Sequence, residues 1–119
     1  MNGNVLKADA FIPALGWSWR GVAWREEHFF RFWIYMNIGS VLLAFGLPIA
    51  PGLRVLILCL GALVLAAEYF NTAIERVVNH LSPGQHPLAK AAKDAGSAGV
   101  ALTAGAAGVA WVFALWGLL

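Results

Sequence analysis

The sequence predicts an all-α integral membrane protein, in which an N-terminal amphipathic surface helix precedes three transmembrane helices. Apolar residues make up 61% of the 119 residues and charged residues only 12%, and mean hydropathy is +0.72. A soluble domain has roughly 45–50% apolar and about 25% charged residues, and a fold this small could not bury such an excess. The apolar residues also come in long runs. Residues 1–119 are therefore expected to form a single membrane domain.

The surface helix is predicted for residues 11 to about 31. Apolar side chains form one stripe, and Pro13 fits the first helical turn, where its missing N–H is not needed. Tryptophans beside arginines suit a helix that lies in the headgroup layer. The opposite side of this helix is lined by Trp17, Arg20, Trp24, Glu27 and Arg31.

Three membrane helices are predicted for residues 32–50, 53–81 and 88–119. The first has about the twenty residues that a bilayer core requires, and Pro48 with Pro51 ends it. A turn of Ser, Pro, Gly and His follows the second. The third is rich in Gly and Ala, which favours close helix packing in lipid. Three spans make a thin monomer, so we expect a homo-oligomer.

The distribution of Lys and Arg predicts the orientation. Four basic residues precede the first span, Arg54 alone lies between the first two spans, and Arg76, Lys90 and Lys93 lie between the last two. Because short cytoplasmic loops carry the excess of Lys and Arg, the N-terminus and the second loop are predicted to be cytoplasmic. The net charge of +2 is too small and too dispersed to suggest nucleic acid.

A polar stripe marks the second half of the second span. At 100° per residue its members fall within one narrow arc of an otherwise apolar helix. Ionisable groups at membrane depth are costly and usually functional. Glu68 is the strongest candidate, since an apolar run precedes it and no basic residue lies within one turn. The polar stripe consists of Glu68, Asn71, Thr72, Glu75 and Asn79.

These groups could perform phosphoryl chemistry, although each also has a structural explanation. Two carboxylates can hold Mg²⁺ together with substrate phosphates, a third can act as a general base, and Lys93 can stabilise a transferring phosphoryl group. Conversely, Glu27 with Arg31 and Lys90 with Asp94 have the spacing of helix-surface ion pairs. No G-x-x-x-x-G-K-[ST] loop is present.

The residues alone leave two classes open. One is a membrane enzyme that uses a metal and a carboxylate base on a substrate delivered from the lipid. The other is a small oligomeric transporter whose intramembrane Glu binds a cation or a proton. A transporter needs its acid near the bilayer midplane, whereas the acids here cluster at one face, which favours the enzyme.

Two motifs then identify a resemblance. Glu68-x-x-Asn71-Thr72-Ala73-Ile74-Glu75, followed by Lys93-Asp94-x-Gly96-Ser97-Ala98, resembles the prokaryotic diacylglycerol kinase family, which includes the undecaprenol kinases. The match extends from about Leu65 to the C-terminus. It continues more loosely through Glu27-x-x-Phe30-Arg31 and Trp17-Ser18-Trp19-Arg20-Gly21.

The resemblance implies a homotrimer in the bacterial cytoplasmic (inner) membrane that transfers the ATP γ-phosphoryl to a lipid hydroxyl. Diacylglycerol, giving phosphatidic acid, is the expected acceptor, and undecaprenol is the alternative. Glu68 resembles the family's general base, and Glu27 and Glu75 its ligands for Mg²⁺ or another divalent cation. The implied nucleotide-binding residues are Ser18, Glu27, Glu75, His86, Lys93 and Asp94, and the implied substrate-binding residues are Glu68, Asn71 and Ser97.

The chain departs from the family pattern at four places. Residues 10–13 lack the basic residue that the family usually carries early in the surface helix. Trp33 replaces an acid, Asn79 replaces a common Asp, and the spacing from Ser18 to Trp24 is short. The catalytic motifs are intact, so we expect activity to be retained. The departures bear on nucleotide affinity and lipid choice.

Overall fold

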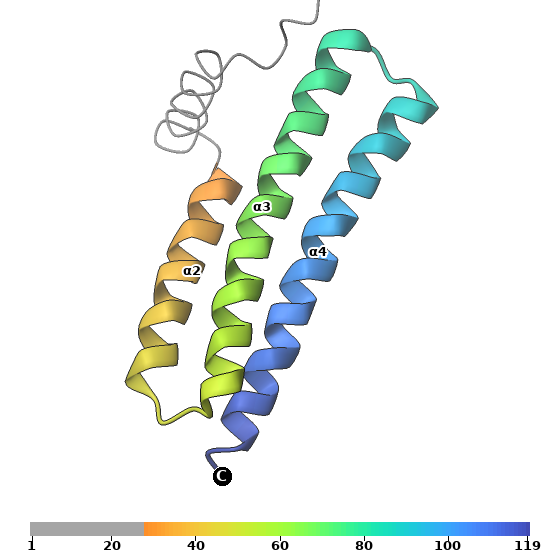
Figure 1. The fold of residues 1–119 in the computed structure, drawn as a ribbon. Coiled ribbons are helices and arrows are strands. Elements are labelled where there is room, and N and C mark those ends of the chain that lie inside the picture. Colours follow the sequence, from red (N-terminus) through yellow and green to blue (C-terminus); the bar gives the residue numbers. More distant parts are fainter. Residues whose placement is uncertain (1–27) are drawn as a thin grey trace, which may run out of the picture. The chain divides into compact units, whose positions relative to one another are not determined.

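The computed structural model describes residues 28–119, and these form three helices in the order α2, α3 and α4 (Figure 1). Helix α2 spans His28–Gly46, α3 spans Pro51–Leu81 and α4 spans Pro87–Trp116. Residues 32–119 form one compact unit. The part of the predicted surface helix that precedes His28 lies outside the described residues. The described chain is all-helical, as the sequence predicted.

Helix α2 differs from the predicted first span at both ends. Residues 28–31, which we assigned to the surface helix, are its first turn, because no Gly or Pro interrupts the chain there. The helix ends at Gly46 and not near Ala50. Glycine is a weak helix former, and a residue before proline, here Leu47, is disfavoured in the helical conformation. The last helical bond runs from the Leu47 N–H to the Leu43 carbonyl at 3.0 Å.

Helices α3 and α4 form a long hairpin, side by side along most of their length (Figure 1). Each begins with a proline in its first turn, where the missing N–H has no helical partner to lose. Their 31 and 30 residues correspond to roughly 45 Å at about 1.5 Å per residue. A bilayer core is only about 30 Å thick. Both helices are therefore long enough to cross the core and to carry polar turns beyond it.

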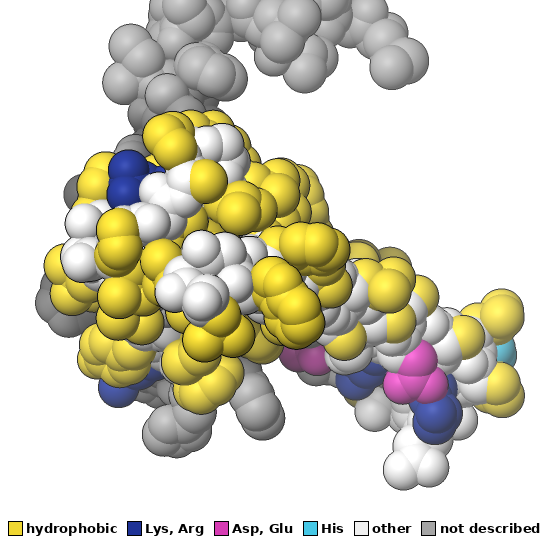
Figure 2. Space-filling view, turned by 90° about the horizontal axis from the view of Figure 1, so that it is seen from below, with side chains coloured by type: hydrophobic (Ala, Val, Ile, Leu, Met, Phe, Trp, Pro, Cys, Tyr) yellow, Lys and Arg dark blue, Asp and Glu magenta, His cyan; other side chains and the backbone are white. Residues whose placement is uncertain are grey.

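The outer surface of the described helices is strongly apolar. Both α3 and α4 are apolar and long enough to span a membrane, and the apolar segment of α2, Phe30–Gly46, is shorter. Large hydrophobic side chains such as Leu42, Leu102 and Phe113 are exposed. Figure 2 shows hydrophobic side chains over most of the visible face, with the acidic side chains confined to one edge. Exposed apolar area on this scale is typical of a membrane-embedded surface.

Polar side chains join the helices inside the bundle. The Trp111 indole Nε1–H of α4 donates to the Ser40 hydroxyl of α2 at 2.8 Å. The Asn37 amide of α2 lies against Gly61 of α3, where a Cβ would come within 2.9 Å of the amide nitrogen. All four of these residues line a cavity of about 190 Å³ between the three helices. Neutral polar pairs and small residues of this kind hold helices together in lipid.

The turn between α2 and α3 is organised by Arg54. Its Nε donates to the Ala44 carbonyl at 2.7 Å, and one Nη donates to the carbonyls of Leu47 and Ile49 at 3.3 Å. Its guanidinium also lies 5.6 Å from the centre of the Phe45 ring. The last carbonyls of a helix have no helical donors. Arg54 supplies a donor to one of these groups, the Ala44 carbonyl, and to two carbonyls of the following turn, and so joins the end of α2 to α3.

The first prediction concerns this arginine. Arg54→Met keeps the alkyl stem but removes the arginine donors from three carbonyls, although that of Leu47 keeps the Ile49 N–H at 2.8 Å. The free energy of unfolding should fall by about 2 kcal/mol. Arg54→Lys should recover only part of the loss, because one ammonium cannot reproduce the planar set of donors. Equilibrium unfolding in mixed detergent micelles measures both. Arg76→Met removes an exposed cation from α3 and is the control. An unfolding midpoint of Arg54→Met equal to that of wild type would contradict the role.

Candidate active site

The polar stripe of α3 is buried at its centre and becomes exposed toward the end of the helix. Glu68 is 6% exposed, Asn71 9% and Thr72 1%, whereas Glu75 is half-buried and Asn79 is exposed. The Thr72 hydroxyl donates to the Glu68 carbonyl one turn earlier at 2.9 Å. This bond satisfies the hydroxyl within its own helix. The stripe thus leads from a shielded carboxylate to an accessible one.

Glu68 is the one acidic residue among those buried in the described part of the chain. A carboxylate removed from water is costly unless other groups compensate it. Buried ionisable groups in apolar helices therefore tend to be kept for function. Glu68 lies where the apolar run of α3 gives way to its polar turns.

Asn71 connects the stripe to α4. Its amide packs directly against Gly96: a Cβ built on Gly96 would overlap the Asn71 Oδ1 and would lie 3.5 Å from the Ile74 side chain. The Asn71 Oδ1 is buried and accepts no hydrogen bond from any described residue. Gly96 lies between Asp94 and Ser97. The contact therefore brings the two sequence motifs together.

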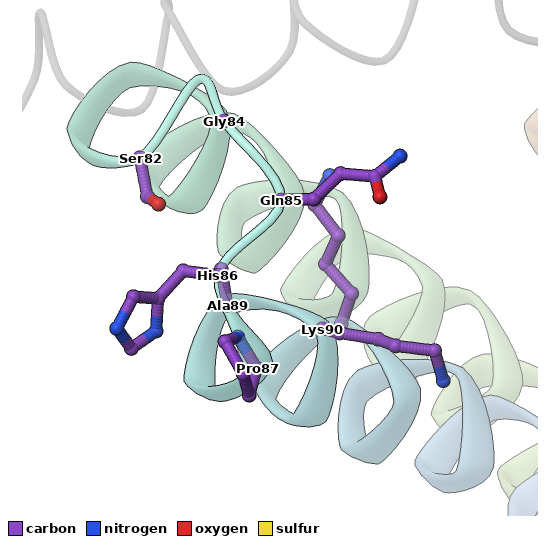
Figure 3. Close-up of a pocket in the computed structure, with 8 residues that line it drawn as sticks. Ser82, Gly84, Gln85, His86, Pro87, Ala89 and Lys90 are labelled. Carbon is purple, nitrogen blue, oxygen red and sulfur yellow. The ribbon is translucent and has the colours of Figure 1, made fainter.

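A second feature is a cavity of about 490 Å³ where the α3–α4 loop meets the start of α4 (Figure 3). We call it the loop cavity. In Figure 3 the side chains of Gln85 and Lys90 extend to one side of the loop and the His86 ring to the other. No acidic side chain is among its described lining residues, which suits an anion. They are Ser82, Gly84, Gln85, His86, Pro87, Ala89, Lys90 and Lys93.

His86 is the N-cap of α4. Its Nδ1 accepts a hydrogen bond from the Leu88 N–H at 3.1 Å, so a neutral imidazole must carry its proton on Nε2. That nitrogen is then a donor. Because Lys90 and Lys93 line the same cavity, the start of α4 offers donors and positive charge together.

Asp94 makes an ion pair with Lys90 at this end of α4. The Lys90 Nζ lies 2.6 Å from the Asp94 Oδ2. Both residues precede the apolar, membrane-spanning part of the helix. The pKa of Lys90 is raised above its ordinary value, first by the hydrogen bond to Asp94 and second by the negative charge of Asp94. The pair that the sequence suggested as a helix-surface contact is therefore formed.

The other predicted site residues are placed as follows. Ser97 is exposed on α4 beside Gly96, and Glu68 does not line the loop cavity. Glu27 and Ser18 lie outside the described residues. Among residues 28–119, no group of three His, Cys, Asp or Glu side chains is close enough to hold a metal ion. Sequence reasoning missed that Lys90 shares the loop cavity with Lys93, although their i,i+3 spacing puts them on one helix face.

Comparison with known proteins shows the family of this chain. A model of the family described as prokaryotic diacylglycerol kinase matches residues 16–115. The chain belongs to this family. A protein of Escherichia coli (strain K12) named diacylglycerol kinase is 35% identical over 118 residues, which covers 98% of this chain and 97% of the relative. A protein of Pseudomonas aeruginosa with the same name is 41% identical over 96 residues, which covers 77% and 78% respectively.

Membership of this family confirms the resemblance found in the two motifs. The protein is a membrane-embedded lipid kinase with ATP as its co-substrate. The transporter that the residues alone left open is therefore not retained.

The second prediction tests the Asn71–Gly96 contact. Gly96→Ala places a methyl group on the Asn71 side chain, and such overpacking in a close contact costs about 1–3 kcal/mol. We expect a lower unfolding midpoint and reduced kinase activity. Gly105→Ala on the same helix is the matched control, because its Cβ meets no atom within 4 Å and alanine is the better helix former. Equal midpoints for the two variants would show that α3 and α4 do not depend on this contact.

Proposed function

We propose that the protein transfers the γ-phosphoryl group of ATP to the hydroxyl of diacylglycerol, giving phosphatidic acid. The buried carboxylate of Glu68 carries the proposal, because a lipid hydroxyl must lose a proton to a group that it meets at the membrane surface. The two relatives named diacylglycerol kinase support this acceptor. Undecaprenol is the alternative acceptor, and the experiment below offers both.

Glu68 would act as the general base. Its carboxylate accepts the proton of the lipid hydroxyl while the hydroxyl oxygen forms a bond to the γ-phosphorus, and the bond from that phosphorus to the bridging oxygen breaks to release ADP. Burial serves this role, because a carboxylate that has already lost water needs little reorganisation when the alcohol arrives. Asn71, one turn away, and Ser97, beside Gly96, are the polar groups proposed to orient the substrate.

A divalent cation such as Mg²⁺ would be held by Glu75 and Glu27. The part of this set that the structure describes fits a hard cation. Glu75 is a half-buried carboxylate on the same helix face as Asn71, whose Oδ1 accepts from no residue that the structure describes. Mg²⁺ takes oxygen ligands, with few from protein and the rest from phosphates and water. When bound, the cation would neutralise charge on the phosphoryl oxygens.

The nucleotide would bind at the start of α4. His86 and Lys93 line the loop cavity, and Lys93 would face phosphate oxygens as a point charge. Asp94 can only accept hydrogen bonds, so its partner on the nucleotide would be a hydroxyl or an amine. Ser18 would complete this set from the N-terminal segment. Catalysis by such a site depends on position and charge more than on covalent chemistry.

The proposed membrane arrangement has the N-terminal surface helix and three spans in the bacterial inner membrane, with the active site cytoplasmic. Helix α2, with 19 residues, reaches about 28 Å, which is close to the thickness of a bilayer core. Arg54 lies at one end of the helices and Lys90 with Lys93 at the other, in agreement with the charge rule. Assembly as a homotrimer is part of the proposal and rests on the resemblance to the family.

The third prediction tests the base. Glu68→Gln removes the proton acceptor but keeps the shape, and we expect transfer to fall by about 10²–10⁴-fold. The assay follows labelled γ-phosphoryl from MgATP into diacylglycerol or undecaprenol, offered separately to protein in detergent. Oligomer size and unfolding midpoint serve as controls. Label in diacylglycerol that disappears in the variant supports the proposal. Label only in undecaprenol would show that undecaprenol is the acceptor. Full activity of Glu68→Gln would show that Glu68 is not the general base.

The fourth prediction tests the cation site. Glu75→Gln replaces a charged ligand by a neutral one, so half-maximal activity should need several-fold more Mg²⁺. Asn79→Ala, one turn further along the same stripe but exposed, is the control and should keep the wild-type requirement. A Mg²⁺ titration of Glu75→Gln that overlays the wild-type curve would exclude Glu75 as a ligand.

A further inference from the structure

We propose that Lys90 is a positioning residue for the nucleotide, acting through Asp94. This inference rests on the proposed function. Lys90 belongs to neither motif that identified the family, and the sequence alone explained it as half of a surface ion pair. The structure places its ammonium 2.6 Å from the Asp94 Oδ2 and its side chain in the lining of the loop cavity, together with Lys93 (Figure 3).

Helix stability does not account for this pair. Lys90 lies near the N-terminus of α4, where the helix dipole disfavours a positive charge. The order, with Lys four residues before Asp, is the weaker order for such pairs. The two side chains are also 79% and 63% exposed, so solvent screens the attraction. An arrangement that gains little stability is better explained by what it does at the cavity.

The function we infer is compensation of charge. A nucleoside triphosphate brings several negative charges to the start of α4, and Asp94 adds another directly beside Lys93. Lys90 neutralises that carboxylate where the phosphates approach. It also occupies Oδ2, which leaves the other oxygen of Asp94 to accept from a hydroxyl or amine of the nucleotide. Without Lys90, the carboxylate would repel the phosphates and would adopt several orientations.

The experiment measures nucleotide affinity in Lys90→Met, which keeps an unbranched side chain but removes the charge. We expect the KM for MgATP, and the Kd of a non-hydrolysable ATP analogue in equilibrium binding, to rise about threefold to tenfold. The kcat at saturating nucleotide should stay within about twofold. Lys90→Arg should restore both constants. Arg76→Met, which removes an exposed cation from α3 outside the loop cavity, should leave them unchanged.

A double-mutant cycle separates an action through Asp94 from direct contact with the nucleotide. In an Asp94→Asn background, Lys90→Met should change the Kd of the analogue by less than about twofold, because the charge that Lys90 compensates is gone. A Kd that still rises severalfold there would assign Lys90 to the phosphates directly and overturn the proposal, as would an unchanged Kd in the single variant. The binding assay needs no phosphoryl transfer. A wild-type protein that binds the analogue but labels no lipid would refute the proposed function. The Kd values of the variants would still decide the inference on Lys90.

Discussion

The structure depends on how a polar stripe is shielded inside an apolar hairpin. Glu68, Asn71 and Thr72 lie in a helix whose neighbouring residues are almost all apolar, and all three are buried. In lipid, no water is present to solvate them. Helix α4 approaches the stripe closely at Asn71 because Gly96 has no side chain to hold the helices apart there. The site is therefore possible only because one motif supplies the polar groups and the other supplies the small residue that accommodates them.

The two turns that connect the described helices use their cationic side chains differently. At the α2–α3 turn, Arg54 donates to three carbonyls, and the adjoining core consists of buried aliphatic side chains such as Ile49 and Ile57. At the α3–α4 turn, the cations and donors of the loop cavity face outward. At the first turn one arginine donates to backbone carbonyls. At the second turn Lys90 pairs with Asp94, and Lys93 lines the same cavity. Counting positive charges along the sequence predicts the orientation of both turns but does not predict this difference in use.

The sequence predicts the elements well where the pattern is long and regular. The second and third spans start within two residues of α3 and α4, because proline marks both starts, and the polar stripe follows from helical periodicity alone. Helix α2 ends at Gly46 and not near Ala50, because Gly46 and the position before Pro48 already disfavour the helical conformation. The contact between Asn71 and Gly96 and the shared cavity of Lys90 and Lys93 depend on how two helices are packed. No spacing within one helix contains that information.

The length of the α3–α4 hairpin explains how one small chain can serve two substrates of opposite solubility. Helices of 31 and 30 residues exceed a bilayer core by about 15 Å, so the same pair of helices is apolar at one end and carries the loop cavity at the other. In the proposed function, the lipid reaches Glu68 laterally from the membrane while the nucleotide reaches His86 and Lys93 from water. Asn71 lies between these regions on the helix, with a buried oxygen to which no residue of 28–119 donates. A shorter hairpin could bury the carboxylate or present the cations, but it could not do both on one helix pair. A kinase that transfers a phosphoryl group from a nucleotide in water to a lipid in the membrane requires both.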